Sequence, residues 1–140
     1  MLATKIDPAN IKLHECGLFT EDKLIKFYAP LDNEHVSHSV VEGMKSSNYI
    51  EVEVKTITTI MKELSHTSIG LLKVDIEGCE CDVIDQMLSE NVHPRYVSID
   101  FDLGERGEVG RCIKTIKRLN NSGYRIVHQD GPDFSFVRVE

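Results

Sequence analysis

Long apolar runs, tryptophan and an excess of positive charge are missing from this 140-residue sequence. No stretch approaches the roughly 20 apolar residues that a membrane-spanning helix needs, because Lys73 interrupts the central run 69–72. The N-terminal segment has no long apolar core, so we expect no secretory signal peptide. Lys and Arg number 16 against 23 Asp and Glu, which gives a net charge of −7. The composition therefore favours neither nucleic acid nor a membrane as a partner.

The four cysteines form no C-x-x-C pair. Cys79 and Cys81 are two residues apart, which is too close for the usual spacing of zinc ligands. With 41% hydrophobic and 28% charged residues, the chain has the composition of an ordinary globular domain that does not depend on disulfides. We therefore expect one domain, four reduced thiols, no bound metal and a cytoplasmic protein.

The part of the chain before residue 56 has the pattern of strands and turns. Alternating apolar and polar residues predict strands at 11–16, 24–28 and 49–54, with the first two joined as a hairpin. The segment 31–48 is rich in Ser, Asn and Gly, which is typical of a long surface loop.

From residue 57 onward, helices and strands alternate. The apolar spacing predicts, in order, a helix at 57–64, a strand at 69–74, a helix at 80–90, a strand at 96–101, a helix at 108–122, and strands at 124–128 and 134–139. Thr56 is placed to cap the first helix and Gly123 to end the third. This order favours a three-layer α/β sheet that is mostly parallel and ends in an antiparallel hairpin.

Carboxylates gather where two of the predicted strands end. Asp75 follows the strand 69–74, and Asp100 and Asp102 end the strand 96–101. Strands joined by a right-handed crossover commonly lie side by side, and ligands bind outside the carboxyl ends of such strands. We therefore predict one crevice that holds a cation, a hydroxyl group or a positively charged ligand, with Asp100 and Asp102 on the substrate side.

Two more glutamates lie between these strand ends. Glu77 is in the predicted turn, and Glu80 opens the next helix, where a purely structural role with the helix dipole competes with a functional one. Asp75 ends a strand that we expect to be buried, and an ionised group there needs a partner, for which Lys73 is the candidate. A cation site made of Asp75, Glu77 and Asp100 is a weaker alternative.

The segment 71–80, LLKVDIEGCE, resembles the LLKxDxEGxE signature of FkbM-type methyltransferases. Members of that family use S-adenosylmethionine, have a Rossmann-like fold and often methylate the oxygen of a hydroxyl group. Weaker similarities extend the resemblance in order over nearly the whole chain. Residues 10–19 resemble the family's third strand and the turn after it. Residues 24–30 resemble the extra strand that follows, and residues 52–57 resemble the segment that leads into a helix.

The resemblance implies roles for individual residues. Asp75 and Glu77 match the motif's aspartate and first glutamate, and either is placed to accept a proton from a substrate hydroxyl. Glu80 matches the second glutamate, with an orienting or substrate-side role. The acceptor implied is a small molecule or a sugar. A further set matches the segment that borders the adenine of the cofactor: Glu15, Cys16 and Gly17.

The family's first two strands and its glycine-rich cofactor loop have no counterpart in the sequence. The ten residues before Ile11 contain no glycine. Without those strands, the strand at 69–74 has an unpaired edge, which favours pairing with another chain. We therefore expect residues 1–140 to form a partial, N-terminally truncated methyltransferase domain that binds S-adenosylmethionine poorly and is inactive alone. The alternative is a non-catalytic α/β binding or assembly module that forms a homo-oligomer through this edge.

Overall fold

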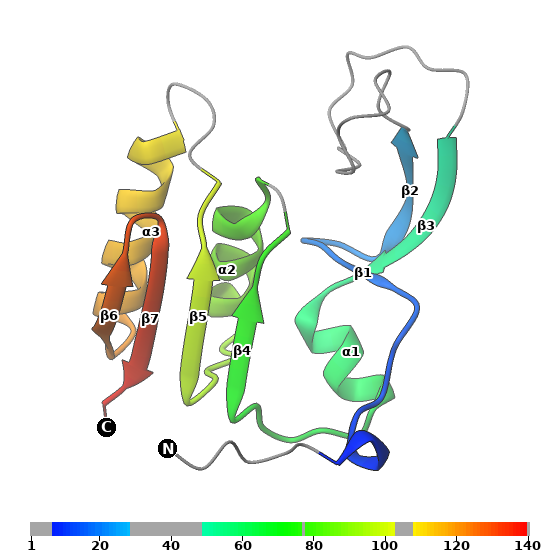
Figure 1. The fold of residues 1–140 in the computed structure, drawn as a ribbon, viewed down its shortest axis with the longest axis horizontal. Coiled ribbons are helices and arrows are strands. Elements are labelled where there is room, and N and C mark those ends of the chain that lie inside the picture. The colour runs from blue at the N-terminus through cyan, green and yellow to red at the C-terminus, as the bar shows by residue number, and fades with distance from the viewer. Residues whose placement is uncertain (1–6, 29–48, 77, 103–107, 140) are drawn as a thin grey trace.

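The computed structural model describes residues 7–28, 49–76, 78–102 and 108–139. Its elements follow in the order η1 (Pro8–Asn10), β1 (Gly17–Leu18), β2 (Lys23–Tyr28), β3 (Tyr49–Lys55), α1 (Ile57–Glu63), β4 (Leu71–Val74), α2 (Glu80–Ser89), β5 (Tyr96–Asp100), α3 (Glu108–Asn121), β6 (Tyr124–Asp130) and β7 (Asp133–Arg138). Figure 1 shows two sheets with the three helices beside them. The chain is therefore a mixed α/β protein, as the sequence predicts. None of the helices in these ranges is long and apolar enough to cross a membrane.

The larger sheet has the strand order β4-β5-β7-β6. β4 and β5 are parallel, whereas β7 is antiparallel to both β5 and β6, so the predicted C-terminal hairpin is confirmed. Gly131 has a φ of +56° in the turn of this hairpin. The described strands of both sheets make two parallel and three antiparallel pairings, and a mostly parallel sheet is therefore not confirmed.

Helices α2 and α3 cover one face of the larger sheet (Figure 1). Alternate residues of the strands face them and are buried: Val74, Val97, Ile99 and Phe136. The helices supply buried side chains to the same cluster: Val83, Ile84, Met87, Cys112 and Leu119. On the other face, Leu71 and Tyr96 are exposed. The part of the larger sheet that the structure describes thus has two layers, and the predicted third layer is not confirmed.

The smaller sheet has the order β1-β3-β2 and differs from the sequence prediction. Residues 11–16 form no strand, and β2 pairs antiparallel with β3, so the predicted hairpin between 11–16 and 24–28 is wrong. The alternation at 11–16 was misleading because these residues face solvent; Leu13 is 87% exposed. β1 extends this sheet on the other side of β3 and runs parallel to it. Glycine is needed at position 17 because a Cβ there would lie 2.8 Å from Val54 Cγ1, which is too close.

The other predicted elements lie close to their expected places. The side chain of Thr56 accepts a hydrogen bond from Thr59 N at 3.1 Å and caps α1. Gly123 has a φ of +88° directly after α3, a conformation that glycine adopts without strain. The predicted loop at 31–48 lies outside the described residues.

All four cysteines are free thiols. Cys81 on α2 and Cys112 on α3 are buried, with their sulfur atoms 3.6 Å apart. Burial raises the pKa of the Cys81 thiol to about 12, so this thiol is a packing group between the two helices.

Candidate functional site

Carboxylates at the ends of β4 and β5 lie at one edge of the larger sheet. Val74 and Ile99 form the last pair of the β4–β5 ladder, and Asp75 and Asp100 follow them directly. Gly78 has a φ of +102°, and a Cβ added to it would lie 3.7 Å from Asp102 Oδ2. The structure therefore brings the end of β4, the turn after it and the end of β5 together, which is the arrangement expected from the strand order.

The expectation that Asp75 ends a buried strand is wrong, because Leu71 and Lys73 of β4 are exposed and Asp75 is exposed too. β4 is the outermost described strand of its sheet, so solvent reaches this side chain. The carboxylate Oδ2 lies 3.3 Å from Lys73 Nζ, and each of the two side chains is 56% exposed. Lys73 is thus the partner that the sequence predicted. An ion pair this exposed contributes little to stability, so the Asp75 carboxylate remains accessible to a ligand.

Glu80 is buried and holds the turn that follows Asp75. Its side chain accepts hydrogen bonds from Ile76 N at 3.1 Å and from Gly78 N at 3.0 Å. Cys79, at the N-cap position of α2, does not cap the helix through its side chain. Glu80 therefore stabilises the turn between β4 and α2. Glu77, in the same turn, lies outside the described residues.

Asp133 belongs to this edge and was not among the residues that the sequence singled out. It opens β7 and lies directly opposite Asp100 in the β5–β7 ladder. Desolvation, together with the negative charges of Asp133 and Asp75, raises the pKa of the Asp100 carboxyl. Because like charges meet here, the edge favours a bound cation or a proton. The DGPD turn at 130–133 marks Asp133 in the sequence. No residue near this turn indicates that β7 pairs with β5, however, so the position of Asp133 opposite Asp100 was not predicted.

The carboxylate edge is not arranged as a metal site in the part of the chain that the structure describes. No group of three or more His, Cys, Asp or Glu side chains in those residues is placed to hold a metal ion. The weaker alternative of a cation site includes Glu77, which is outside these ranges.

The residues predicted to border a cofactor lie at the start of β1 in the smaller sheet and directly before it. Glu15 is exposed, Cys16 is half-buried, and Gly17 begins β1. Leu18, the next residue, packs against the same hydrophobic cluster as Ile76, which follows Asp75. The shared cluster is the structural link between this segment and the carboxylate edge.

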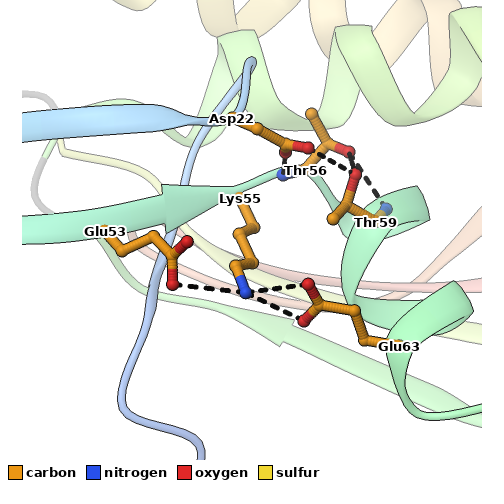
Figure 2. A network of polar contacts seen from close by, with 6 residues as sticks. All are labelled: Asp22, Glu53, Lys55, Thr56, Thr59 and Glu63. Carbon is orange, nitrogen blue, oxygen red and sulfur yellow. Dashed lines mark hydrogen bonds and ion pairs between the residues drawn. The ribbon is translucent and has the colours of Figure 1, made fainter.

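Asp22 fastens the end of this segment to the start of α1 (Figure 2). Asp22 Oδ1 accepts a hydrogen bond from Thr56 N at 2.8 Å, and Oδ2 accepts one from Thr59 Oγ1 at 2.7 Å. These bonds, the one from Thr56 first, lower the pKa of the Asp22 carboxyl. The ionised side chain therefore positions residues 17–22 against β3 and α1.

Lys55 continues the network on the other side of the same junction (Figure 2). Its Nζ lies 2.8 Å from a carboxylate oxygen of Glu63 on α1 and 3.2 Å from Glu53 on β3. The hydrogen bond to Glu63, followed by that to Glu53, raises the pKa of Lys55. These contacts hold α1 against the end of β3.

We expect Asp22→Asn to destabilise the fold near neutral pH and to have little effect in acid. The folded-state pKa of Asp22 lies below its usual 3.8. The ionised carboxylate therefore contributes stability above the pKa of the unfolded chain, and this contribution is lost as the pH falls through the folded-state value. Urea unfolding of both proteins at about pH 7 and about pH 2 measures the difference. An equal difference at the two pH values would contradict a role for the charge.

Two comparisons identify similar proteins. The model of the methyltransferase FkbM domain matches residues 2–137. A curated relative, Methyltransferase 1 from Beauveria bassiana (strain ARSEF 2860), is 26% identical over 94 residues; the match covers 54% of this chain and 38% of the relative. The chain therefore corresponds to well under half of that relative's length. No solved structure matches the chain.

Proposed function

Since the chain belongs to the FkbM methyltransferase domain family, we propose that it carries the methyl-transfer edge of an S-adenosylmethionine-dependent methyltransferase. The supporting observation is the meeting of Asp75, Asp100 and Asp102 at the carboxyl ends of β4 and β5. Ligands of open α/β sheets bind outside such strand ends. The LLKVDIEGCE motif spans β4, the segment after it and the first residue of α2, so the family signature includes the strand end where Asp75 lies.

The carboxylates at this edge fit a positively charged cofactor. S-adenosylmethionine, when bound, supplies a methyl group activated by a positively charged sulfonium. Asp100 and Asp133 are directly opposed, and their charges together with that of Asp75 make the edge strongly negative. A positive charge held nearby would relieve this repulsion. Residues 15–17 would border the adenine, a role that rests on the family resemblance.

We propose that Asp75 accepts the proton of an acceptor hydroxyl. Direct displacement at a methyl group needs close alignment of the reacting atoms and, for a hydroxyl, a base. Lys73 contacts only one oxygen of the exposed Asp75 carboxylate, Oδ2, so the other remains available to the acceptor. Glu77 is the second candidate base. The acceptor class, a hydroxyl of a small molecule or a sugar, follows from the resemblance.

We further propose that the 140-residue chain is inactive by itself. Gly17 is the first glycine in the sequence, so the residues before it contain no glycine-rich loop for the methionine part of the cofactor. The carboxylate edge then lacks the groups that would hold the methyl donor against the acceptor.

Methyl transfer is measured with S-adenosylmethionine labelled in its methyl group and a panel of sugars and small alcohols. We expect no transfer above background from the 140-residue chain. Transfer that disappears in Asp75→Asn but persists in Asp85→Asn would overturn the proposed inactivity while supporting the role of Asp75. Asp85 is a matched control because it is also ion-paired, to Arg118 at 3.0 Å, and it lies on α2.

The open edge of β4 supports a second candidate function. β4 is the outer strand in the order β4-β5-β7-β6 of the larger sheet, and unpaired edges favour pairing with another chain. The alternative proposal is a non-catalytic module that forms a homo-oligomer through β4. Light scattering separates the candidates, since a stable dimer without affinity for S-adenosylhomocysteine supports the module and a monomer at high concentration argues against it.

A further inference from the structure

A polar cavity of about 1240 Å³ lies at the opposite end of the larger sheet from the carboxylates. The starts of β4 and β5 and the end of β7 meet there, close to the C-terminus of the chain (Figure 1). Its polar lining includes Asn91, His93, Arg95, Asn121, Ser122 and Arg138. None of these residues takes part in the proposed methyl transfer.

Two arginines of this cavity, Arg95 just before β5 and Arg138 at the end of β7, occupy opposed positions. Tyr96 and Val137 form the first pair of the β5–β7 ladder, and Arg138 N donates to Arg95 O at 3.0 Å just beyond it. Side chains at opposed positions of antiparallel strands lie close together, and like charges there are destabilising. The sheet thus brings two arginine residues to the lining of one cavity.

Neither arginine is neutralised by a carboxylate among the residues with described positions. The ion pairs of those ranges include neither Arg95 nor Arg138, although the chain has seven more acidic than basic residues. The described partner of the Arg95 guanidinium is the neutral ring of Tyr96, whose centroid is 5.5 Å away. Within the described residues, the positive charge at this cavity therefore has no carboxylate to neutralise it.

His93 adds a buried polar atom without a partner. Its Nδ1 is buried and makes no hydrogen bond. Tyr124, whose ring centroid is 6.5 Å from that of His93, uses its hydroxyl hydrogen on Pro94 O at 2.7 Å and so does not donate to Nδ1. Buried polar atoms normally have a hydrogen-bond partner, and an imidazole N–H at this position can donate to an oxyanion.

We propose that this cavity binds a phosphate group, with Arg95 and Arg138 on its oxygens and His93 beside them. Two guanidiniums, with the side chains of Asn91 and Asn121, offer more N–H donors than a carboxylate can accept. A phosphate provides more acceptor oxygens and more negative charge, which suits paired arginines. The cavity is also larger than the phosphate ion, so it has room for an organic group attached to it.

Inorganic phosphate, titrated into the full chain by calorimetry at an ionic strength fixed with sodium chloride, tests the site. We expect saturable binding that Arg95→Gln and Arg138→Gln each weaken by about tenfold or more, because each removes charge-assisted hydrogen bonds. Arg125→Gln is the matched control, since Arg125 is an exposed arginine on β6 outside the cavity lining, and we expect no change. Phenyl phosphate, titrated in parallel, distinguishes a site for phosphate monoesters from one for the free ion, and tighter binding of either probe supports the proposal.

Unfolding in the absence of phosphate separates binding from a structural role. Both glutamine variants should unfold at the same or a higher urea concentration than the unmodified chain, because they relieve repulsion between like charges. Absence of binding at about 10 mM phosphate, or equal affinity in all the variants, would overturn the proposal. A lowered unfolding midpoint in both variants without phosphate would also overturn it. These outcomes do not depend on methyl transfer.

Discussion

Replacing Glu80 by alanine is expected to lower the free energy of unfolding by about 2–4 kcal/mol. The side chain is 3% exposed, and its carboxylate accepts hydrogen bonds from the backbone N–H groups of Ile76 and Gly78. Alanine would leave both donors without partners at the start of α2, and unsatisfied buried donors are more costly than the loss of a solvated bond. Because this turn follows Asp75, the substitution would also release the backbone next to the proposed base.

Asp82→Ala provides the control for Glu80→Ala. Asp82 is also an acidic residue in the first turn of α2, but its side chain is exposed and pairs with Arg111 on α3. We expect its loss to cost less than about 1 kcal/mol. Urea unfolding monitored by far-UV circular dichroism measures both variants. Similar losses for the two would show that Glu80 acts only through the helix dipole, and would contradict its role in the turn.

Ile84→Ala is expected to cost about 2–5 kcal/mol of stability, because it leaves a cavity between α2 and the larger sheet. Ile84 is fully buried in the cluster that joins both helices to β5 and β7. Ile113→Ala is a matched control, since Ile113 also lies on a helix, α3, but is 48% exposed; we expect a cost below about 1 kcal/mol. Equal losses, measured by the same urea unfolding, would contradict the placement of α2 on the covered face.

Local patterns predicted the elements whose stabilising contacts are also local. The three helices follow the apolar spacing. Thr56 caps the start of α1, and Gly123 follows the end of α3. The hairpin of β6 and β7 follows from two strands joined by a glycine turn. In each case the residues that define the element are close in sequence, so one window of the chain contains the whole signal.

Long-range pairing was the part that the sequence did not encode locally. β2 pairs with β3 across 20 intervening residues that lie outside the described ranges, and β1 joins the other side of β3. Residues 11–16 have the same alternation as a strand, but no neighbouring strand pairs with them. Alternation shows that a segment is able to form a strand, whereas its partner depends on the tertiary structure.

The same distinction separates the site residues that were found from the one that was missed. Asp75 follows β4 and Asp100 ends β5, and a single helix joins these strands, so the crossover rule was sufficient to predict that the two residues are neighbours. Asp133 comes to the same edge only because β7 inserts beside β5. The exposure of Asp75 has a similar cause, because it depends on β4 being the outer described strand. The roles of these residues in methyl transfer remain predictions.

Titration of S-adenosylhomocysteine into the isotope-labelled chain, followed through its backbone amide NMR signals, tests the proposed cofactor edge most directly. We expect weak, saturable shifts with a dissociation constant of about 1 mM or weaker, because the glycine-rich loop is not among these residues. The shifts should include the amides of Glu15–Gly17, Asp75 and Gly78, and Asp75→Asn should leave those of residues 15–17 in place. No saturable shift, or shifts confined to the arginine cavity at the other end of the sheet, would contradict the account.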